Sequence, residues 1–225
     1  MKPIVVVTST RTVQREDIEL KHYPFIDIVP IEVDESCIKP YYDWLIFTSV
    51  NAIKLFQPYL NLINVKHIAA IGTKTKALAE DYSIPIEVMP STFTQEGLLD
   101  SLENRLHKQS ILIPCSRLAR NKLTDHLREW DNEVQRLHIY EPKTNYENVD
   151  KVHELIENNK VTHVTFSSSS AVSSYFEKYN KIDNIEVYAI GEITEEKLKT
   201  YHQECKVAPR ATLNDMLNKI LEEVE

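Results

Sequence analysis

Residues 44–52 read WLIFTSVNA and residues 163–171 read HVTFSSSSA, and these two stretches decide the fold class. Each begins with a short run of apolar and β-branched residues, continues with hydroxyl side chains, and leads into a segment with helical spacing. Such runs are typical of buried strands, whereas Ser or Thr ahead of a helical segment is typical of a helix N-cap. Each stretch therefore predicts a buried strand, a polar turn at its carboxyl end and a helix.

The two stretches belong to a longer internal repeat. A shift of 119 positions aligns residues 47–90 with residues 166–209 without a gap and produces twelve identical pairs. Composition alone would produce about three. The identities include Ala70-Ile71-Gly72 on Ala189-Ile190-Gly191, which accounts for two of the three glycines in the chain. We infer that the chain contains a duplicated unit.

Short β-branched runs alternate with helix-period segments along almost the whole chain, which is typical of parallel sheets flanked by helices. The expected strands lie near residues 4–7, 26–31, 44–48, 67–71, 86–89, 111–114, 134–140, 163–166, 187–190 and 206–208. The expected helices lie near residues 51–60, 74–80, 95–106, 118–129, 149–158, 171–179, 194–201 and 213–222. The fold class is therefore α/β.

The two copies of the unit occur in a permuted order, because two strands follow the first copy and two others precede the second. This order predicts two similar lobes, each a five-stranded parallel sheet. Residues 1–33 with 144–225 are the expected discontinuous domain, and residues 36–139 the inserted one. Residues 34–41 and 141–148 are the expected inter-domain linkers. Two neighbouring connections form a hinge, and a ligand is expected between the lobes.

Composition excludes several classes of partner. The net charge is −8 over 225 residues and no basic block stands out, so no nucleic acid is expected as a partner. No apolar run approaches the roughly 20 residues of a membrane span, and the first residues lack the regions of a signal peptide. Three separated cysteines offer no disulfide framework. The sequence predicts a cytoplasmic protein, and it predicts a monomer because no heptad seam is evident.

The three glycines also limit the cofactors. A phosphate-binding loop needs several glycines close together, and neither Gly-x-Gly-x-x-Gly nor a P-loop can be written with Gly72, Gly97 and Gly191. The eight histidines and three cysteines match no Cys-x-x-Cys or His-Glu-x-x-His spacing. We therefore expect no nucleotide cofactor and no metal.

Candidate binding residues recur at the carboxyl ends of strands in both copies. Ser49 and Ser168 follow strands, and the alternative role of each is a plain helix N-cap. Gly72 and Gly191 are expected to let the chain turn tightly at strand ends, with Thr75 and Thr194 one turn further on. The carboxyl edge of a parallel sheet is the usual ligand edge, and free N–H groups at helix starts suit an anion. These residues are candidate ligand contacts.

Six short motifs together carry a resemblance to a known family. They are Ile46-Phe47-Thr48-Ser49-x-x-Ala52, Ile71-Gly72-x-x-Thr75, Thr94-x-Glu96-Gly97-Leu98-Leu99, His138-Ile139-Tyr140-Glu141, Phe166-Ser167-Ser168 and Ile190-Gly191-x-x-Thr194. In this order, and over nearly the whole chain, the ensemble resembles the uroporphyrinogen-III synthase family. The resemblance implies two α/β domains joined by a two-stranded β-ladder, with the active site in the cleft.

The resemblance also implies an activity in tetrapyrrole (haem) biosynthesis. A cofactor-free hydro-lyase of this family closes linear hydroxymethylbilane to uroporphyrinogen III, inverts the terminal pyrrole ring and releases water. Loss of the hydroxyl gives an azafulvene, and a spiro intermediate then fragments and recloses. Hydroxymethylbilane is the implied small-molecule partner, and the upstream hydroxymethylbilane synthase is a further expected partner.

Residues that match family site positions are Ser49, Thr75, Tyr140, Ser168 and Thr194. Tyr140 is the expected catalytic residue, because its phenol can donate a hydrogen bond to the departing hydroxyl. Its alternative role is to cover the hinge with its hydroxyl in water. The substrate is a polycarboxylate, so the cleft must be locally positive in an acidic protein. The expected sources of positive charge are the helix N-termini after Ser49, Gly72, Ser168 and Gly191 and the side chains of Arg117 and Arg120, with Arg11 behind them.

The competing hypothesis is a non-catalytic, two-lobed small-molecule binding or sensor protein. Such a protein would share the duplicated lobes, the double crossing and the hinge. Turnover of the ligand, as opposed to stoichiometric retention, separates the two hypotheses.

Overall fold

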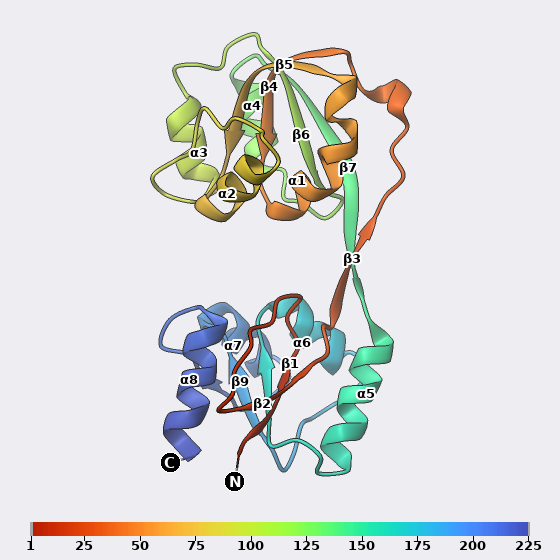
Figure 1. Cartoon of the computed structure of the whole chain (residues 1–225), viewed down its shortest axis with the longest axis vertical. Helices are drawn as coiled ribbons and strands as arrows, with labels where there is room; N and C mark the ends of the chain where they lie inside the picture. The colour runs from red at the N-terminus through yellow and green to blue at the C-terminus, as the bar shows by residue number, and fades with distance from the viewer. Residues whose placement is uncertain (1, 225) are drawn as a thin grey trace. The chain divides into compact units, whose positions relative to one another are not determined.

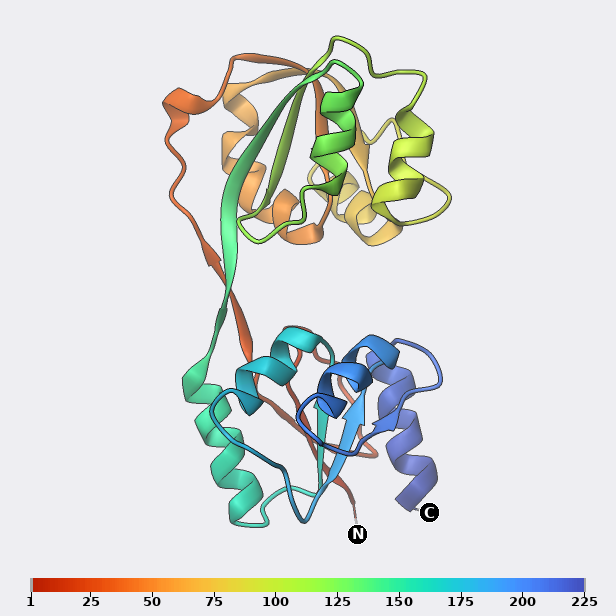
Figure 2. The ribbon, with the colours of Figure 1, turned by 180° about the vertical axis from the view of Figure 1, so that it is seen from behind.

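The computed structural model describes residues 2–224, which form two compact units. Unit 1 contains the described residues up to Asp27 together with those from Lys143 onward, and unit 2 contains Ile28–Pro142. In Figures 1 and 2 the ribbon of unit 1 is dark red at its start and teal to blue later, and that of unit 2 runs from orange to green. Each unit is described by itself below.

Unit 1 is built on a five-stranded sheet in the order β10-β9-β8-β1-β2. Its strands are β1 (Ile4–Val7), β2 (Glu19–His22), β8 (His163–Phe166), β9 (Glu186–Ala189) and β10 (Lys206–Val207). All four neighbouring pairs are parallel. Its helices are α5 (Tyr146–Glu157), α6 (Ser169–Phe176), α7 (Glu192–Lys199) and α8 (Leu213–Val224).

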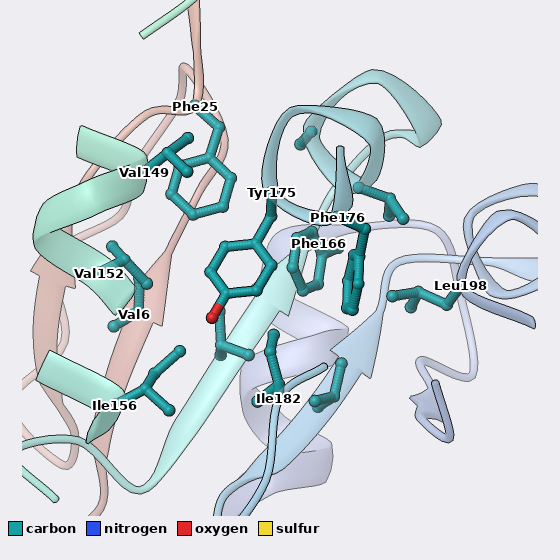
Figure 3. Close-up of a cluster of buried hydrophobic side chains, with 14 of the residues drawn as sticks. Val6, Phe25, Val149, Val152, Ile156, Phe166, Tyr175, Phe176, Ile182 and Leu198 are labelled. Atoms are coloured by element: carbon teal, nitrogen blue, oxygen red, sulfur yellow. The ribbon is translucent and has the colours of Figure 1, made fainter. Parts of the chain in front are cut away.

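Apolar residues on both faces of this sheet form the core of unit 1. On one face Val6 and Phe166 pack with α5, α6 and α7 (Figure 3). The ring of Tyr175 stacks on that of Phe25, with 6.0 Å between the ring centroids. On the other face Val5 packs with α8. Successive residues of a strand point to opposite faces, so a strand covered on both sides must be apolar throughout. This explains the unbroken run at the start of the chain.

Unit 2 holds the second five-stranded sheet, in the order β3-β7-β6-β4-β5. Its strands are β3 (Ile26–Pro30), β4 (Tyr41–Phe47), β5 (Asn64–Ala70), β6 (Ser110–Ser116) and β7 (Glu133–Thr144). Its α-helices are α1 (Val50–Phe56), α2 (Thr73–Asp81), α3 (Gln95–Leu102) and α4 (Lys122–Glu129), and two 3-10 helices are η1 (Glu35–Cys37) and η2 (Gln57–Leu62). Helices α3 and α4 pack on one face of the sheet, and α1 and α2 on the other.

The predicted α/β architecture with two five-stranded sheets flanked by helices is confirmed. Strand register confirms the duplication as well. Trp44 pairs with His67 between β4 and β5, and the equivalent positions His163 and Glu186 pair between β8 and β9. Ile111 of β6 pairs with Trp44, as Val5 of β1 pairs with His163. The strands after the first copy and before the second are thus equivalent.

Two expectations about individual strands are wrong. Residues 26–31 were expected in the sheet of residues 1–33 and 144–225, but β3 pairs with β7 in the other sheet, and β2 is the neighbour of β1. The β2 sequence ELKH is polar because it lies at a sheet edge, where charged side chains are favoured. Residues 86–89 form no strand, and only Val88 makes an isolated bridge to Ala69.

The chain passes from unit 1 to unit 2 within β3 and returns within β7. These strands are neighbours, and their pairing is antiparallel, because Asn145 N donates to Phe25 O and Ile31 N donates to Ile139 O. In the segments expected to be linkers, η1 occupies Glu35–Cys37, β7 continues to Thr144 and α5 begins at Tyr146. The chain therefore crosses between the units on two strands whose backbones are hydrogen-bonded to each other.

Candidate functional site

The two repeated serines have the same local structure. Ser49 is the N-cap of α1, where its Oγ accepts a hydrogen bond of 3.1 Å from Ala52 N. Ser168 is the N-cap of α6, and its Oγ accepts one of 3.2 Å from Ala171 N. A hydroxyl at this position satisfies a backbone donor that has no partner within the helix. Capping is therefore a role that both serines perform, and any role toward a ligand is additional.

Tyr140 lies in β7 at a break in strand register. Cys115 of β6 pairs with His138, but the next residue, Ser116, pairs with Tyr140, so β7 contains one extra residue. A bulge of this kind redirects the side chains that follow it. As a result Ile139 and Tyr140 are both buried, although they are consecutive in a strand. The bulge turns the phenol inward.

The hydroxyl of Tyr140 meets the hydroxyl of Ser49, with 3.0 Å between Oη and Oγ. Burial raises the pKa of the Tyr140 phenol, since the charged phenolate is the form that a low-dielectric environment disfavours. The hydrogen bond with Ser49 lowers the same pKa by a smaller amount, and Cys115 raises it further. The phenol therefore keeps its proton at neutral pH and acts as a neutral hydrogen-bond donor.

Both hydroxyls line a pocket of about 630 Å³ in unit 2. This pocket lies beyond the carboxyl ends of β4, β5 and β6, since Thr48, Ile71 and Ser116 also line it. Of the residues singled out in the sequence, it contains Ser49, Arg120 and Tyr140. The structure thus brings these three together within one unit, at the edge where ligands of open parallel sheets bind.

Sequence reasoning missed several residues of this pocket. Phe93 and Leu118 line it with 53% and 70% of their surfaces exposed, and Gln95 lines it with a buried, unpartnered Oε1. An apolar side chain in a polar loop is the one signal that could have found Phe93 and Leu118. The motif that begins at Thr94 pointed to this loop, but it did not indicate which side chains face the pocket.

Of the three predicted arginines, only Arg120 lines the pocket, and Arg11 is an exposed residue of unit 1. Arg117 directs its guanidinium to Glu141, with 3.2 Å between Nη1 and Oε2. The loop that carries Arg120 is held by Arg136, which donates to the Asn121 side chain and, at 2.8 Å, to Ala119 O. Arg120 is exposed, and its positive charge at the pocket is the feature that suits a carboxylate ligand.

The chain turns at both glycines, since only two residues separate β5 from α2 and β9 from α7, but the turn does not require glycine. Gly72 has φ −166° and Gly191 has φ −178°, which is extended backbone that any residue adopts. They are the N-caps of α2 and α7, and neither helix has a side-chain cap. The backbone N–H groups of the first turns are therefore available to an acceptor from outside the helix. Thr75 of α2 is buried and is not among the residues that line the pocket.

Unit 1 has its own pocket, of about 510 Å³, at the start of α7. It contains Gly191 and Thr194 but not Ser168, whose Oγ lies 3.0 Å from Ser170 Oγ. Glu192 and Glu195 occupy the first turn of α7, so they reduce its attraction for an anion. Acidic residues are absent from the first turn of α2. Of these two helices, only α7 therefore carries acidic side chains that oppose an anion at its start.

Across the described residues, no three side chains of His, Cys, Asp or Glu are grouped so that they could hold a metal ion. The absence of a metal and of a cofactor stays a prediction. None of the helices within residues 2–224 combines the length and the apolar composition that a membrane span requires.

Comparison with known proteins places this site in a family. The family model described as uroporphyrinogen-III synthase HemD matches residues 7–218, and this range includes both pockets and every candidate residue. The chain belongs to the uroporphyrinogen-III synthase family. The resemblance found in the sequence is therefore confirmed.

Individual relatives agree with this assignment. The porphyrin biosynthesis protein HemD of Ruminiclostridium josui is 28% identical over 235 residues, which cover 96% of this chain. The same alignment covers 45% of that protein, so the chain spans less than half the length of this relative.

Solved structures show the same fold. Uroporphyrinogen-III synthetase from Helicobacter pylori superimposes with a TM-score of 0.70 at 18% identity and covers 99% of this chain and 100% of that one. A mutant uroporphyrinogen III synthase from Thermus thermophilus superimposes with a TM-score of 0.62 at 15% identity, covering 99% and 98%. At these identities the likeness concerns the fold alone.

Proposed function

We propose that this chain cyclises hydroxymethylbilane to uroporphyrinogen III with inversion of the terminal pyrrole ring and loss of water. The observation that carries the proposal is the buried phenol of Tyr140, bonded to Ser49 at the wall of the unit 2 pocket, in a chain of this family. A neutral donor at a polycarboxylate site suits the departure of a hydroxyl group.

Tyr140 assists the first chemical step. The bond between the hydroxymethyl carbon and its oxygen breaks, and the pyrrole nitrogen of the same ring gives up its proton. Hydroxide and proton leave together as water, and the ring becomes a neutral, electrophilic azafulvene. A hydrogen bond from Tyr140 Oη stabilises the negative charge that develops on the leaving oxygen. Because burial raises the pKa of this phenol, we assign it hydrogen bonding rather than full proton transfer.

Selection of the product isomer is a matter of orientation. Without the enzyme, the unsubstituted end of the chain attacks directly and gives the type I isomer. The type III isomer requires attack by the substituted carbon, a spiro intermediate, fragmentation and reclosure. A pocket that holds the reacting ends in that geometry favours the second route, since correct orientation raises reaction rates by many powers of ten.

Phe93 is proposed as an apolar wall for a pyrrole ring, because it is half exposed at the pocket. We expect Phe93→Ala to raise KM about 2- to 10-fold with a smaller effect on kcat, the range for one aromatic contact. Tyr82→Ala is the matched control, since Tyr82 is a similarly exposed aromatic of unit 2 outside this pocket. Steady-state kinetics on both variants would check the assignment, and equal KM values for them would remove it.

Arg120 is proposed as a contact for a substrate carboxylate. Arg120→Gln should raise KM about 3- to 10-fold, as expected for a charge-assisted hydrogen bond that stays in contact with water. This difference should shrink as salt increases. Arg105→Gln removes the same charge elsewhere in unit 2, where Arg105 pairs with Glu87, and serves as the control. A KM that responds to both variants alike would indicate a general charge effect.

The remaining candidates stay part of the proposal. In unit 1 the proposed substrate contacts are Ser168, Gly191 and Thr194. In unit 2 they are Gly72 and Arg117, which are next in sequence to residues that line the pocket, and Thr75 of α2. The backbone N–H groups at the start of α2 suit a carboxylate, because no side chain caps them. Each position awaits the same kinetic comparison.

Partner, location and assembly are also proposed. The substrate would come from an enzyme that produces hydroxymethylbilane, which is the second proposed partner. All three cysteines are free thiols, which suits a reducing compartment such as the cytoplasm. A monomer is proposed, and light scattering of the purified chain would give its mass.

The decisive experiment supplies freshly generated hydroxymethylbilane to the purified chain, oxidises the products and separates the type I and type III isomers by chromatography. We expect predominantly type III product without added metal or nucleotide. Type I product at the uncatalysed rate, from a protein shown to be folded, would overturn the proposal. Stoichiometric retention of the substrate in that case would favour the binding-protein hypothesis.

A further inference from the structure

We infer that Ser49 is a positioning residue for Tyr140: its hydroxyl donates to Tyr140 Oη, so that the phenolic hydrogen points into the unit 2 pocket. The inference rests on the proposed function for its effect on turnover. It changes the predicted role of Ser49, which sequence reasoning treated as a substrate contact.

The argument begins with the hydrogens available at Ser49. A serine hydroxyl carries one hydrogen and two acceptor lone pairs. Ala52 N lies 3.1 Å from Ser49 Oγ and can only donate, so it occupies one lone pair. The second contact of the hydroxyl is Tyr140 Oη at 3.0 Å, where either oxygen can be the donor. Among the described residues, no other acceptor lies at hydrogen-bond distance from the Ser49 hydroxyl, so we assign its hydrogen to Tyr140 Oη.

The direction of this bond decides what Tyr140 offers to a ligand. When Ser49 donates, the phenolic hydrogen of Tyr140 is not part of the bond between the two residues. It can then be donated to an oxygen atom in the pocket that both residues line. A hydroxyl that accepts a hydrogen bond also becomes a better donor, because hydrogen bonds in a chain polarise one another.

The N-cap bond keeps this arrangement in place. Ser49 Oγ is held over the first turn of α1 by Ala52 N, and the backbone of Ser49 is extended, with φ −158° and ψ 157°. Tyr140 is held by burial, with 8% of its surface exposed. Ser168 has the same cap in unit 1, but its second contact is Ser170 Oγ. Within the described residues, the pairing of a cap with a buried phenol thus belongs to the unit 2 copy.

The repeat makes it possible to separate capping from proton positioning. Ser49→Gly removes the hydroxyl while keeping a residue that caps nearly as well as serine, and Ser49→Thr keeps the hydroxyl. Ser168→Gly makes the same chemical change at the equivalent cap. The pKa of Tyr140 is followed by NMR of ring-labelled tyrosine, with its signal assigned by its absence in Tyr140→Phe.

We expect Ser49→Gly to lower kcat about 3- to 10-fold, the effect of one lost hydrogen bond, and to raise the pKa of Tyr140. Ser49→Thr should restore both quantities. Ser168→Gly should change thermal stability by a similar amount and leave the pKa of Tyr140 as it is. In the Tyr140→Phe background, Ser49→Gly should cause no further loss of kcat, because the group it acts through is gone.

A lower or unchanged pKa of Tyr140 in Ser49→Gly would overturn the inference, as would a loss of kcat that adds fully to that of Tyr140→Phe. Failure of the proposed function gives a different result. The wild-type chain would then make no type III product, whereas the pKa comparison would still report which hydroxyl donates.

Discussion

Tyr140→Phe should lower kcat for the type III product by about 10- to 100-fold, at or below the lower end of the range for a positioned acid, because the phenol assists by hydrogen bonding alone. The substitution removes one oxygen and leaves the ring, which packs in the apolar core of unit 2. KM should change little, because the lost hydrogen bond acts mainly when charge develops on the leaving oxygen. Slower turnover also gives spontaneous closure more time, so the share of type I product should rise.

The control for this prediction is Tyr42→Phe, which deletes another buried phenolic hydroxyl of the same unit. Tyr42 Oη contacts Gln135 Oε1 at 2.6 Å and accepts from Lys39 N at 2.9 Å, away from the pocket. We expect it to lose stability but to keep its kcat. Rates and isomer ratios are measured together, with thermal unfolding as the check on folding. Full activity in Tyr140→Phe would remove the role assigned to this residue.

The pH profile of the wild-type chain follows from the same environment. The pKa of Tyr140 is raised above the ordinary value of a tyrosine, which is about 10. The donor is therefore fully protonated at neutral pH, and ionisation of Tyr140 should cause no loss of rate until the pH exceeds that ordinary value. A decline in kcat at lower pH must arise from another group.

Gly97→Ala should destabilise the chain by about 1–3 kcal/mol, the usual effect of forcing atoms into a packed site. Gly97 lies in the first turn of α3, where its N–H donates to Thr94 Oγ1 at 3.1 Å. A Cβ there would lie 3.0 Å from Thr92 Cβ, 3.1 Å from the carbonyl carbon of Thr92, and closer still to its oxygen. In a helix, alanine is normally favoured over glycine by about 1 kcal/mol, so this close backbone contact reverses the usual sign.

Thermal unfolding measures this effect, and roughly 2–4 °C of lowered Tm is expected for each kcal/mol in a chain of this size. The loop that must move carries Phe93, so a rise in KM should accompany the loss of stability. Gly191→Ser is the control, because the nearest atom to a new Cβ there is Ala211 Cβ at 3.7 Å and serine can cap α7. A Tm for Gly97→Ala at or above that of the wild-type chain would contradict the prediction.

Much of the fold could be predicted because burial leaves a clear pattern. Strands covered on both faces, such as Ile111 to Cys115, are continuous apolar runs, and Ser49 and Ser168 mark the helices that follow β4 and β8. Edge elements lack this pattern. Strand β2 is polar because one of its sides has no neighbouring strand, and residues 86–89 resemble a strand although only Val88 pairs. The pairing of β3 with β7 depends on contacts distant in sequence.

The candidate site was less predictable than the fold, for a physical reason. Residue type identified Ser49 and Tyr140 separately, but their contact depends on a bulge in β7, and a bulge leaves no periodic signal. Phe93 and Gln95 belong to a loop, whose conformation is determined by tertiary contacts such as that between Thr92 and Gly97. The glycine rationale failed because Gly72 and Gly191 have ordinary backbone angles.

The permuted order of the duplicated unit also shows which loop of unit 2 its sheet does not need. In unit 2, α3 ends at Leu102 and β6 begins at Ser110, so one loop joins them. Their equivalents in unit 1 are α8 and β1, which stand at opposite ends of the described chain and are joined by no loop within it. Both sheets nevertheless have the same strand order at this point. Covalent continuity between these two elements is thus dispensable, and residues 103–109 are the place where unit 2 can be opened to create new termini.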